Sequence, residues 1–175
     1  ARITDLYLDK DKGLLYLATY NGFKVFDYRN EKMLPAFISE EKDIYTIYAE
    51  ACTAVTKDKE GFVWFGTGFT NTVLVRWDPS NNDIAYYHDF SNKDRGWKEN
   101  RVITLFSDRD GKLWAGSTMS SLSLYSPEKN SFHHYQKDPL LNSSISGNNI
   151  TSIYQNTSGL IWLGTEGYGV ERFHP

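Results

Sequence analysis

A seven-residue motif occurs four times in this chain, and this repetition limits the folds that the chain can adopt. Each copy begins with Gly, carries an aromatic residue at its fourth position, and ends with an apolar, a small and a hydroxyl-bearing residue. The copies span residues 13–19, 61–67, 111–117 and 159–165. Their aromatic residues are Tyr16, Trp64, Trp114 and Trp162, at intervals of 48, 50 and 48 residues. The chain is therefore a tandem array with a unit of about 49 residues.

The residues around each motif predict four short strands per repeat, which we name A to D in chain order. Two apolar residues precede each motif, and the turn that joins them to it begins with Asp or Asn and ends with Gly. This is the turn chemistry of a β-hairpin, so the motif itself is expected to form strand B. A second apolar or aromatic pair predicts strand C, and strand D is expected near residues 34–38, 84–87 and 132–135.

A period near 50 residues with four antiparallel strands per unit is typical of a blade of a β-propeller. We therefore predict an all-β chain of about three and three-quarter blades, each a four-stranded antiparallel meander. The blades are expected at about residues 1–49, 50–99 and 100–148, with an incomplete fourth blade at about 149–175. A solenoid with turns of 48 residues is the alternative, although solenoids favour shorter and more uniform repeats.

The number of repeats is smaller than a closed ring of such blades needs. Blades of this size commonly form rings of about six to eight, and seven blades would need roughly 340 residues. The 175 residues are thus expected to form a partial ring of a seven-bladed propeller, with apolar faces left open on the first and last blades. We expect either a fragment of a longer propeller or two copies that pair through those faces; the start at Ala1, without Met, agrees with a processed or excised piece.

Charge and composition argue against several classes of partner and cofactor. Lys and Arg number 19 and Asp and Glu 22, a net charge of −3, so a nucleic-acid partner is not expected. No apolar run approaches the roughly 20 residues of a membrane-spanning helix, so this segment is not expected to contact a membrane. The single cysteine, Cys52, excludes an internal disulfide, and the adjacent His133 and His134 would point to opposite faces of a strand. No metal and no cofactor is predicted.

The longer string Asp-x-x-Gly-x-apolar-Trp-x-Gly-Thr/Ser, followed by Arg-aromatic-x-Pro, resembles the two-component regulator propeller repeat. The fullest copies lie at residues 58–79 and 156–173, and the first repeat departs from the pattern with Tyr16 and Ala18 in place of Trp and Gly. The resemblance covers essentially the whole chain. It implies the extracytoplasmic, periplasmic sensor of a bacterial hybrid histidine kinase, often one that acts on carbohydrate-utilisation genes. The full-length protein is accordingly expected to be a histidine kinase.

Candidate ligand-binding residues are sought on the loops that vary between repeats, because binding residues concentrate on variable loops held by a rigid frame. In a meander the A–B and C–D turns share one side of the sheet, and the B–C and D–A loops share the other. The A–B turns are short and uniform, so the B–C and D–A loops are the better candidates. Flat rings can cover the C–H faces of sugars, and Arg or Asn can bond to their hydroxyls. The candidates are Trp97, Arg95, Phe69, Asn71, Tyr20 and Tyr168.

The four motif aromatics recur at the same position of every repeat, which predicts a structural role for them and not a role in ligand binding. Tyr16, Trp64, Trp114 and Trp162 are expected to pack between neighbouring blades. Catalysis needs convergent groups with matched pKa values, and none stands out in the sequence. Together with this absence, the resemblance to the regulator propeller repeat implies a non-enzymatic sensor whose ligand, an oligosaccharide, shifts the population of receptor arrangements. A protein-interaction propeller without a small ligand, and a propeller lyase or hydrolase that acts on glycans, are the alternatives.

Overall fold

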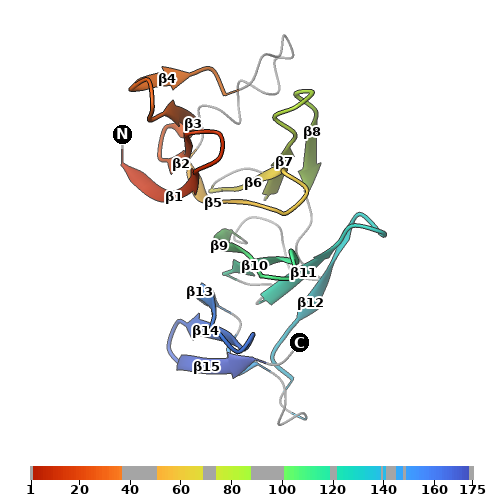
Figure 1. Ribbon diagram of the computed structural model, residues 1–175. Helices are drawn as coiled ribbons and strands as arrows, with labels where there is room; N and C mark the ends of the chain where they lie inside the picture. Colours follow the sequence, from red (N-terminus) through yellow and green to blue (C-terminus); the bar gives the residue numbers. More distant parts are fainter. Residues whose placement is uncertain are drawn as a thin grey trace. The chain divides into compact units, whose positions relative to one another are not determined.

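The computed structural model describes residues 2–36, 51–68, 74–87, 101–118, 122–138, 140, 145–147 and 149–173. Every regular element in these residues is a β-strand (Figure 1). The strands form four antiparallel sheets, each built from strands that follow one another in the chain. The predicted all-β fold of four-stranded meanders, with an incomplete last blade, is confirmed. No helix among these residues is long and apolar enough to cross a membrane.

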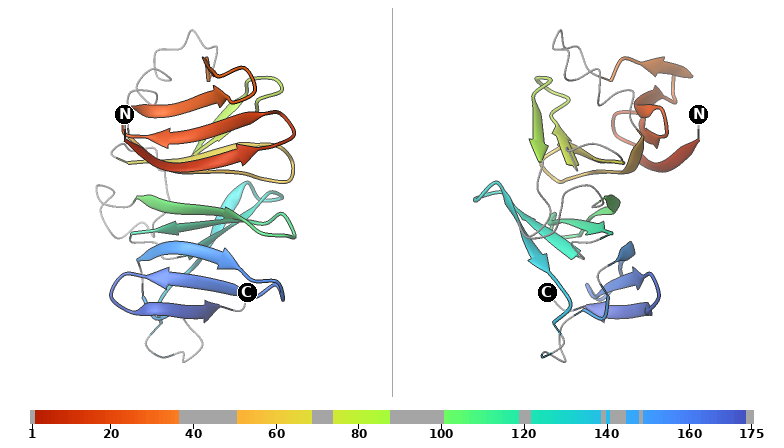
Figure 2. Two further views of the ribbon diagram at one scale, coloured as in Figure 1. Left: turned by 60° about the vertical axis from the view of Figure 1, so that its left-hand side comes forward. Right: turned by 180° about the vertical axis from the view of Figure 1, so that it is seen from behind.

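The chain divides into two compact units, Ala1–His88 and Asp89–Pro175, which we describe separately. The first sheet contains β1 (Ile3–Asp9), β2 (Leu14–Thr19), β3 (Gly22–Asp27) and β4 (Lys32–Leu34). The second contains β5 (Cys52–Lys57), β6 (Val63–Thr67), β7 (Leu74–Trp77) and β8 (Ile84–Tyr87). The third contains β9 (Val102–Ser107), β10 (Leu113–Ser117), β11 (Leu122–Ser126) and β12 (Ser131–Tyr135). The fourth contains β13 (Ile150–Gln155), β14 (Ile161–Thr165) and β15 (Gly169–Phe173). Figure 2 shows the short turns that join strands within a sheet.

The aspartate that opens the A–B turn of the second sheet binds both the turn and the motif tryptophan. One carboxylate oxygen of Asp58 accepts a hydrogen bond from the backbone N–H of Phe62 at 2.9 Å. The other accepts the indole N–H of Trp64 at 2.6 Å, inside the core. Gly61 closes the turn at a φ of 96°, in the left-handed region that glycine enters without steric cost.

The third sheet repeats this arrangement. Asp108 accepts the backbone N–H of Lys112 at 2.8 Å with one oxygen and the indole N–H of Trp114 at 2.8 Å with the other. The spacing Asp-x-x-Gly-x-x-Trp in the sequence is thus explained: the aspartate shapes the hairpin and also satisfies the one polar group of a fully buried indole.

The first sheet uses its turn aspartate differently. One oxygen of Asp9 accepts the backbone N–H of Lys12, three residues on, at 3.1 Å, whereas the other turns use the N–H four residues on. The other oxygen pairs with the ammonium of Lys57, on the second sheet, at 2.6 Å. The motif residue of this repeat is Tyr16, and its buried hydroxyl has no hydrogen-bond partner among the described residues.

In the fourth sheet an asparagine stands in the aspartate position. The side-chain oxygen of Asn156 accepts the backbone N–H of Leu160 at 2.9 Å, which preserves the turn. The second polar group of Asn156 is an NH₂, which donates and cannot accept the indole N–H of Trp162. The fourth repeat therefore keeps the hairpin but offers no acceptor for its tryptophan from this position.

Trp162 departs from the prediction that the four motif aromatics pack between blades. Tyr16, Trp64 and Trp114 are fully buried, but Trp162 is 37% exposed. In the first and third sheets the equivalent ring contacts an aromatic residue of the next sheet, and among the described residues no sheet follows β13–β15. Among the described residues, Trp162 therefore lacks the aromatic neighbour that Tyr16 and Trp114 have in the next sheet.

The first two sheets pack through an aromatic core and three polar contacts between β1 and β5. Phe23 of β3 stacks on Phe65 of β6 with ring centroids 4.5 Å apart. The Thr4 hydroxyl donates to the backbone oxygen of Cys52 at 2.7 Å, and Asp5 accepts the backbone N–H of Val55 at 2.9 Å. The Asp9–Lys57 pair completes the row. The contacts run along both strands and fix the register between the two sheets.

The third and fourth sheets pack through a second core. The ring of Trp114 meets Phe173 of β15 edge to face, with centroids 5.8 Å apart and planes at 78°. Gly116 of β10 faces the next sheet so closely that an added Cβ would lie 2.8 Å from the Ile150 Cγ2 atom. The added Cβ would also lie 2.6 Å from the Cγ2 atom of Thr104 on β9, so the close approach of both β9 and β13 requires Gly116.

Two sheet faces carry exposed apolar side chains at positions that are buried in the equivalent strands of other sheets. On β1, Ile3 and Leu6 are about half exposed, whereas Cys52 and Val55 occupy the same places in β5 and are buried. On β15, Val170 is 70% exposed, whereas the equivalent Leu122 is fully buried. The first and last sheets thus expose to solvent the positions that are buried between sheets within each unit.

Candidate ligand-binding site

The structure describes two of the six residues that the sequence proposes for ligand binding. Trp97, Arg95, Phe69 and Asn71 lie outside the described residues, so their role stays a prediction. Tyr20 and Tyr168 are described, and they belong to different units.

Tyr20 lies in the short loop between β2 and β3 and is 44% exposed. The Thr19 hydroxyl holds this loop, since it donates to the backbone oxygen of Gly22 at 2.7 Å and accepts the N–H of Asn21 at 3.1 Å. The guanidinium carbon of Arg2 lies 5.1 Å from the centre of the Tyr20 ring, within the range of a cation–π interaction. Tyr20 therefore offers an exposed flat ring beside a cation with several hydrogen-bond donors.

Tyr168 lies in the loop between β14 and β15 and is exposed. The ammonium of Lys137 lies 4.7 Å from its ring centre. Gly147 packs against the ring, because an added Cβ there would lie 2.7 Å from the Tyr168 Cδ2 atom. The loops of both units therefore hold the same combination, an exposed tyrosine ring paired with a basic side chain.

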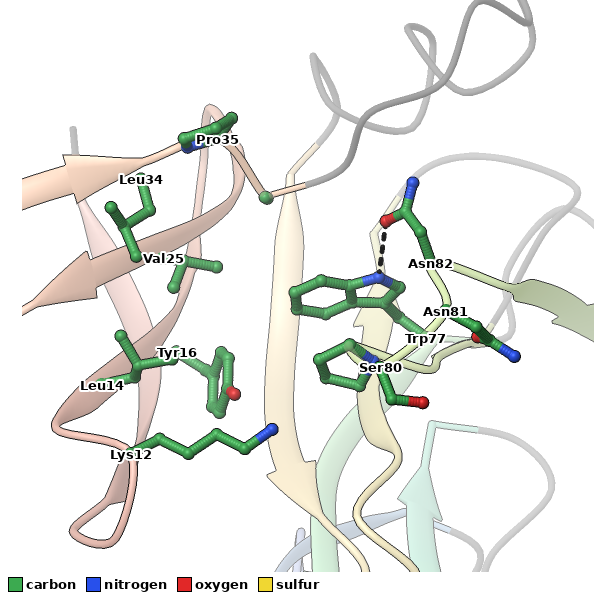
Figure 3. A pocket seen from close by; sticks show the side chains of 12 residues that line it. Lys12, Leu14, Tyr16, Val25, Leu34, Pro35, Trp77, Ser80, Asn81 and Asn82 are labelled. Carbon is green, nitrogen blue, oxygen red and sulfur yellow. Dashed lines mark hydrogen bonds between the residues drawn. The ribbon is translucent and has the colours of Figure 1, made fainter.

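A pocket that the sequence did not predict lies between the first and second sheets, within the first unit (Figure 3). Its volume is about 490 Å³, inside the range of about 300–1,000 Å³ that is usual for small-molecule sites. Leu14, Val25 and Leu34 line one side, from β2, β3 and β4. Trp77 and Pro79 line the other side, from the end of β7 and the turn that follows it.

The wall that contains Trp77 is fixed by the turn between β7 and β8. The indole N–H of Trp77 donates to the side-chain oxygen of Asn82 at 3.1 Å, as Figure 3 shows. Asn82 has a φ of 68°, a left-handed conformation that asparagine tolerates better than most residues. Both the N–H and the hydroxyl of Ser80 donate to Asp78, and these hydrogen bonds hold the pKa of Asp78 below its ordinary value. The indole is thus held at a set angle before any ligand arrives.

The third repeat contains the same kind of hydrogen bond between an aromatic residue and a turn asparagine. The hydroxyl of Tyr125, at the end of β11, donates to the side-chain oxygen of Asn130 at 2.8 Å. Asn130 also has a positive φ, of 47°. A polar aromatic residue followed five positions later by Asn is therefore the sequence signal that marks this kind of turn.

Two polar side chains face the pocket from the first sheet. Burial raises the pKa of Tyr16 to about 12, helped by the negative charge of Asp9, so its hydroxyl stays protonated. Tyr16 meets Trp77 edge to face, with ring centroids 6.2 Å apart. Lys12 lies in the turn between β1 and β2 and forms no ion pair with a described residue. The arrangement can hold a molecule with an apolar body and at least one hydrogen-bond acceptor.

The pocket lies at the strand ends that sequence reasoning set aside. Its polar rim comes from the turns after β1 and β7, whereas Tyr20 follows β2 at the opposite strand ends. The described residues contain no group of three or more His, Cys, Asp or Glu that could hold a metal ion.

Comparison with known families agrees with this geometry. The model of the two component regulator propeller matches residues 96–119 and 144–167, which include the A–B hairpins of the third and fourth sheets. These segments are two-component regulator propeller repeats. No curated protein matches the sequence.

Solved structures extend the likeness over the whole repeat array. The extracellular domain of a putative hybrid two component system from B. thetaiotaomicron is 26% identical, with a TM-score of 0.73 over 99% of this chain and 21% of that one. A second such domain from B. thetaiotaomicron is 19% identical, with a TM-score of 0.63 over 94% of this chain and 19% of that one. The WD40 β-propeller domain of Doa1 is 15% identical, with a TM-score of 0.68 over 99% and 51%.

The last two likenesses show the fold alone. The first, together with the propeller repeats, shows homology to the extracellular domain of a hybrid two-component system. The chain spans about a fifth of the length of these extracellular domains.

Proposed function

We propose that the chain is part of the periplasmic sensor domain of a hybrid two-component histidine kinase and binds its ligand without catalysing a reaction. The likeness that carries this proposal is the 26% identity over 99% of the chain to an extracellular domain of a hybrid two component system. The sequence supports the non-enzymatic part, because no set of convergent catalytic groups stands out in it.

An oligosaccharide is the ligand that the loops favour. Tyr20 with Arg2, and Tyr168 with Lys137, each combine an exposed ring with a cation. Such a ring covers the C–H face of a pyranose, and the basic group donates to its hydroxyls. Trp97, Arg95, Phe69 and Asn71, in other variable loops, remain proposed ligand-binding residues.

Signalling would follow from a shift between receptor arrangements. A ligand changes such an equilibrium only as far as it binds one arrangement better than another. Within the first unit the hydrogen bonds of Thr4 and Asp5 and the Asp9–Lys57 ion pair hold two sheets in one register. The first two blades are therefore suited to respond to a ligand as one body.

The open faces of the first and last sheets define the proposed partners. Ile3 and Leu6 at one end, and Trp162 and Val170 at the other, hold positions that neighbouring sheets bury elsewhere. We infer that propeller blades cover both faces, supplied by the remainder of a longer propeller or by a second copy of the chain.

The ligand proposal is tested by titration of the chain with a panel of oligosaccharides in a calorimeter. We expect one member to bind saturably, and Tyr20→Ala or Tyr168→Ala to weaken its binding by at least about tenfold. Tyr154→Ala is the matched control, because Tyr154 is an exposed tyrosine on β13, outside the loops.

Failure of every sugar to bind, together with specific capture of a protein, would favour the protein-interaction propeller. Release of products from a polysaccharide by the purified chain would favour a glycan-degrading enzyme. Either result would contradict the proposed sensor function.

A further inference from the structure

The pocket between the first and second sheets holds a buried polar group without a partner. Tyr16 has no exposed surface, and its hydroxyl makes no hydrogen bond to a described residue. A buried hydroxyl in this state is unfavourable, and such groups in native proteins usually have a partner. Lys12 and Tyr16 both line the pocket, and Figure 3 shows their side chains at the same end of it.

Lys12 adds a positive charge to this end of the pocket. Its ammonium forms no ion pair with a described residue. Two carboxylates of this region have partners of their own: Asp9 pairs with Lys57 at 2.6 Å, and Asp78 accepts two hydrogen bonds from Ser80. The negative charges of Asp9 and Asp78 both act on Lys12 from beyond ion-pair distance. The ammonium therefore remains able to bind an anion that enters the pocket.

The rest of the pocket is suited to a flat apolar body. Leu14, Val25 and Leu34 form an aliphatic wall, and Trp77 and Pro79 present ring surfaces opposite it. The Asn82 hydrogen bond keeps the indole of Trp77 in place, so little ordering is needed on binding. Ser80 and Asn81 also line the pocket, but their side chains already donate to Asp78 and Asp83. A phosphate needs several donors or charges, whereas the ammonium of Lys12 and the phenolic donor of Tyr16 match a single carboxylate.

We propose that this pocket binds a small organic carboxylate, with the carboxylate at Lys12 and the Tyr16 hydroxyl and the ring of the ligand between Leu34 and Trp77. Because the Tyr16 hydroxyl is fully buried, side chains at this end of the pocket must move before the carboxylate reaches it. The site uses neither Tyr20 nor Tyr168, so it can fail while the oligosaccharide proposal holds, and the reverse.

The experiment follows the indole N–H resonance of Trp77 and the heat of binding during titration of the whole chain. Two matched pairs of probes differ in charge: glucuronate against glucose, and phenylacetate against phenylacetamide. We expect at least one acid to bind about tenfold or more tightly than its neutral partner and to shift the Trp77 resonance. The two pairs distinguish a sugar acid from an aryl acid.

Three variants sharpen the test. Lys12→Met is expected to remove the preference for the acid, whereas Lys10→Met, in the same turn but outside the pocket lining, leaves it unchanged. Tyr16→Phe removes the unpartnered hydroxyl, so it should weaken binding of the acid while the melting temperature stays the same or rises. A purely structural tyrosine hydroxyl would not produce that combination.

Equal binding of acid and neutral probe would overturn the proposal, as would the absence of saturable binding by either acid. Equal losses in Lys12→Met and Lys10→Met would also overturn it. The melting curve of each variant shows that it is folded, so a loss of binding can be assigned to the site.

Discussion

The two central repeats and the two outer repeats share one motif but use its turn residue differently. Asp58 and Asp108 each bind the hairpin backbone with one oxygen and a buried indole with the other. In the first repeat Asp9 gives its second oxygen to Lys57, and in the fourth Asn156 has no second acceptor. The hairpin thus needs one acceptor at this position, and the tryptophan needs a second.

The largest expected difference lies between two tryptophans. Trp114→Ala should lower the free energy of unfolding by about 3–5 kcal/mol, because Trp114 is fully buried and loses both its packing and its hydrogen bond. Trp162→Ala should cost about 1 kcal/mol or less, since its ring is partly exposed. Urea unfolding followed by circular dichroism measures both. Equal losses would mean that Trp162 is covered in solution.

The next effect concerns the acceptor itself. Asp108→Asn keeps the oxygen that binds the Lys112 N–H but places an NH₂ against the indole of Trp114. Two buried donors then face each other, and the free energy of unfolding should fall by about 1–3 kcal/mol. Asp11→Asn, at an exposed turn position, is the control and should change little. A neutral result for Asp108→Asn would show that the indole bond adds nothing to stability.

Asp9 and Asp58 should respond to acid in opposite directions. Burial opposes the charge of Asp9, but the hydrogen bonds from Lys57 and the Lys12 backbone outweigh it and lower its pKa below 3.8. Its contribution to stability is present above pH 3.8 and is lost as the pH falls through the folded value. Burial raises the pKa of Asp58 above 3.8, so its contribution is fully present below pH 3.8 and is lost as the pH rises through the folded value.

Stability curves of the parent chain, Asp9→Asn and Asp58→Asn between about pH 6 and about pH 3 measure this contrast. On acidification the stability advantage of the parent over Asp9→Asn should shrink. The stability of the parent relative to Asp58→Asn should instead rise. Three parallel curves would show that neither carboxyl changes its pKa on folding.

The smallest expected effect is a gain. Asn156→Asp supplies the acceptor that the fourth repeat lacks, six positions before Trp162, and should stabilise the chain by up to about 1 kcal/mol. A downfield shift of the Trp162 indole N–H resonance would report the new hydrogen bond. An unchanged resonance would mean that exposure, and not the missing acceptor, determines the state of Trp162.

The fold could be predicted from the sequence because each repeat carries its own turn and strand signals. Each repeat contains a motif aromatic, Tyr16, Trp64 or Trp114, and a turn that opens with Asp and closes with Gly. These features lie within one repeat, and they correctly indicated the sheets. The exposure of Trp162 could not be predicted from the same pattern. A ring is buried by its neighbour as well as by its own sheet, and the motif describes one sheet at a time.

The candidate site was less accessible to sequence reasoning. Tyr20 and Tyr168 were predicted to bind ligand because they lie in loops that vary between repeats. Both are exposed beside a cation, and their role in binding stays a prediction. The pocket combines Lys12 and Tyr16 of one repeat with Trp77 of the next, and no local pattern shows which side chains of two repeats will face each other. The sequence analysis did not single out the spacing of Trp77 and Asn82, because its meaning depends on the geometry of the turn that joins β7 and β8.

The bond between Asp58 and Trp64 joins two residues six positions apart, inside one repeat. A copy of that repeat therefore contains both the donor and the acceptor of this buried hydrogen bond. It requires no matching substitution in the neighbouring blade. Duplication of one repeat in the gene therefore lengthens the array by one whole unit. The new unit requires only an apolar face of a neighbouring blade to pack against.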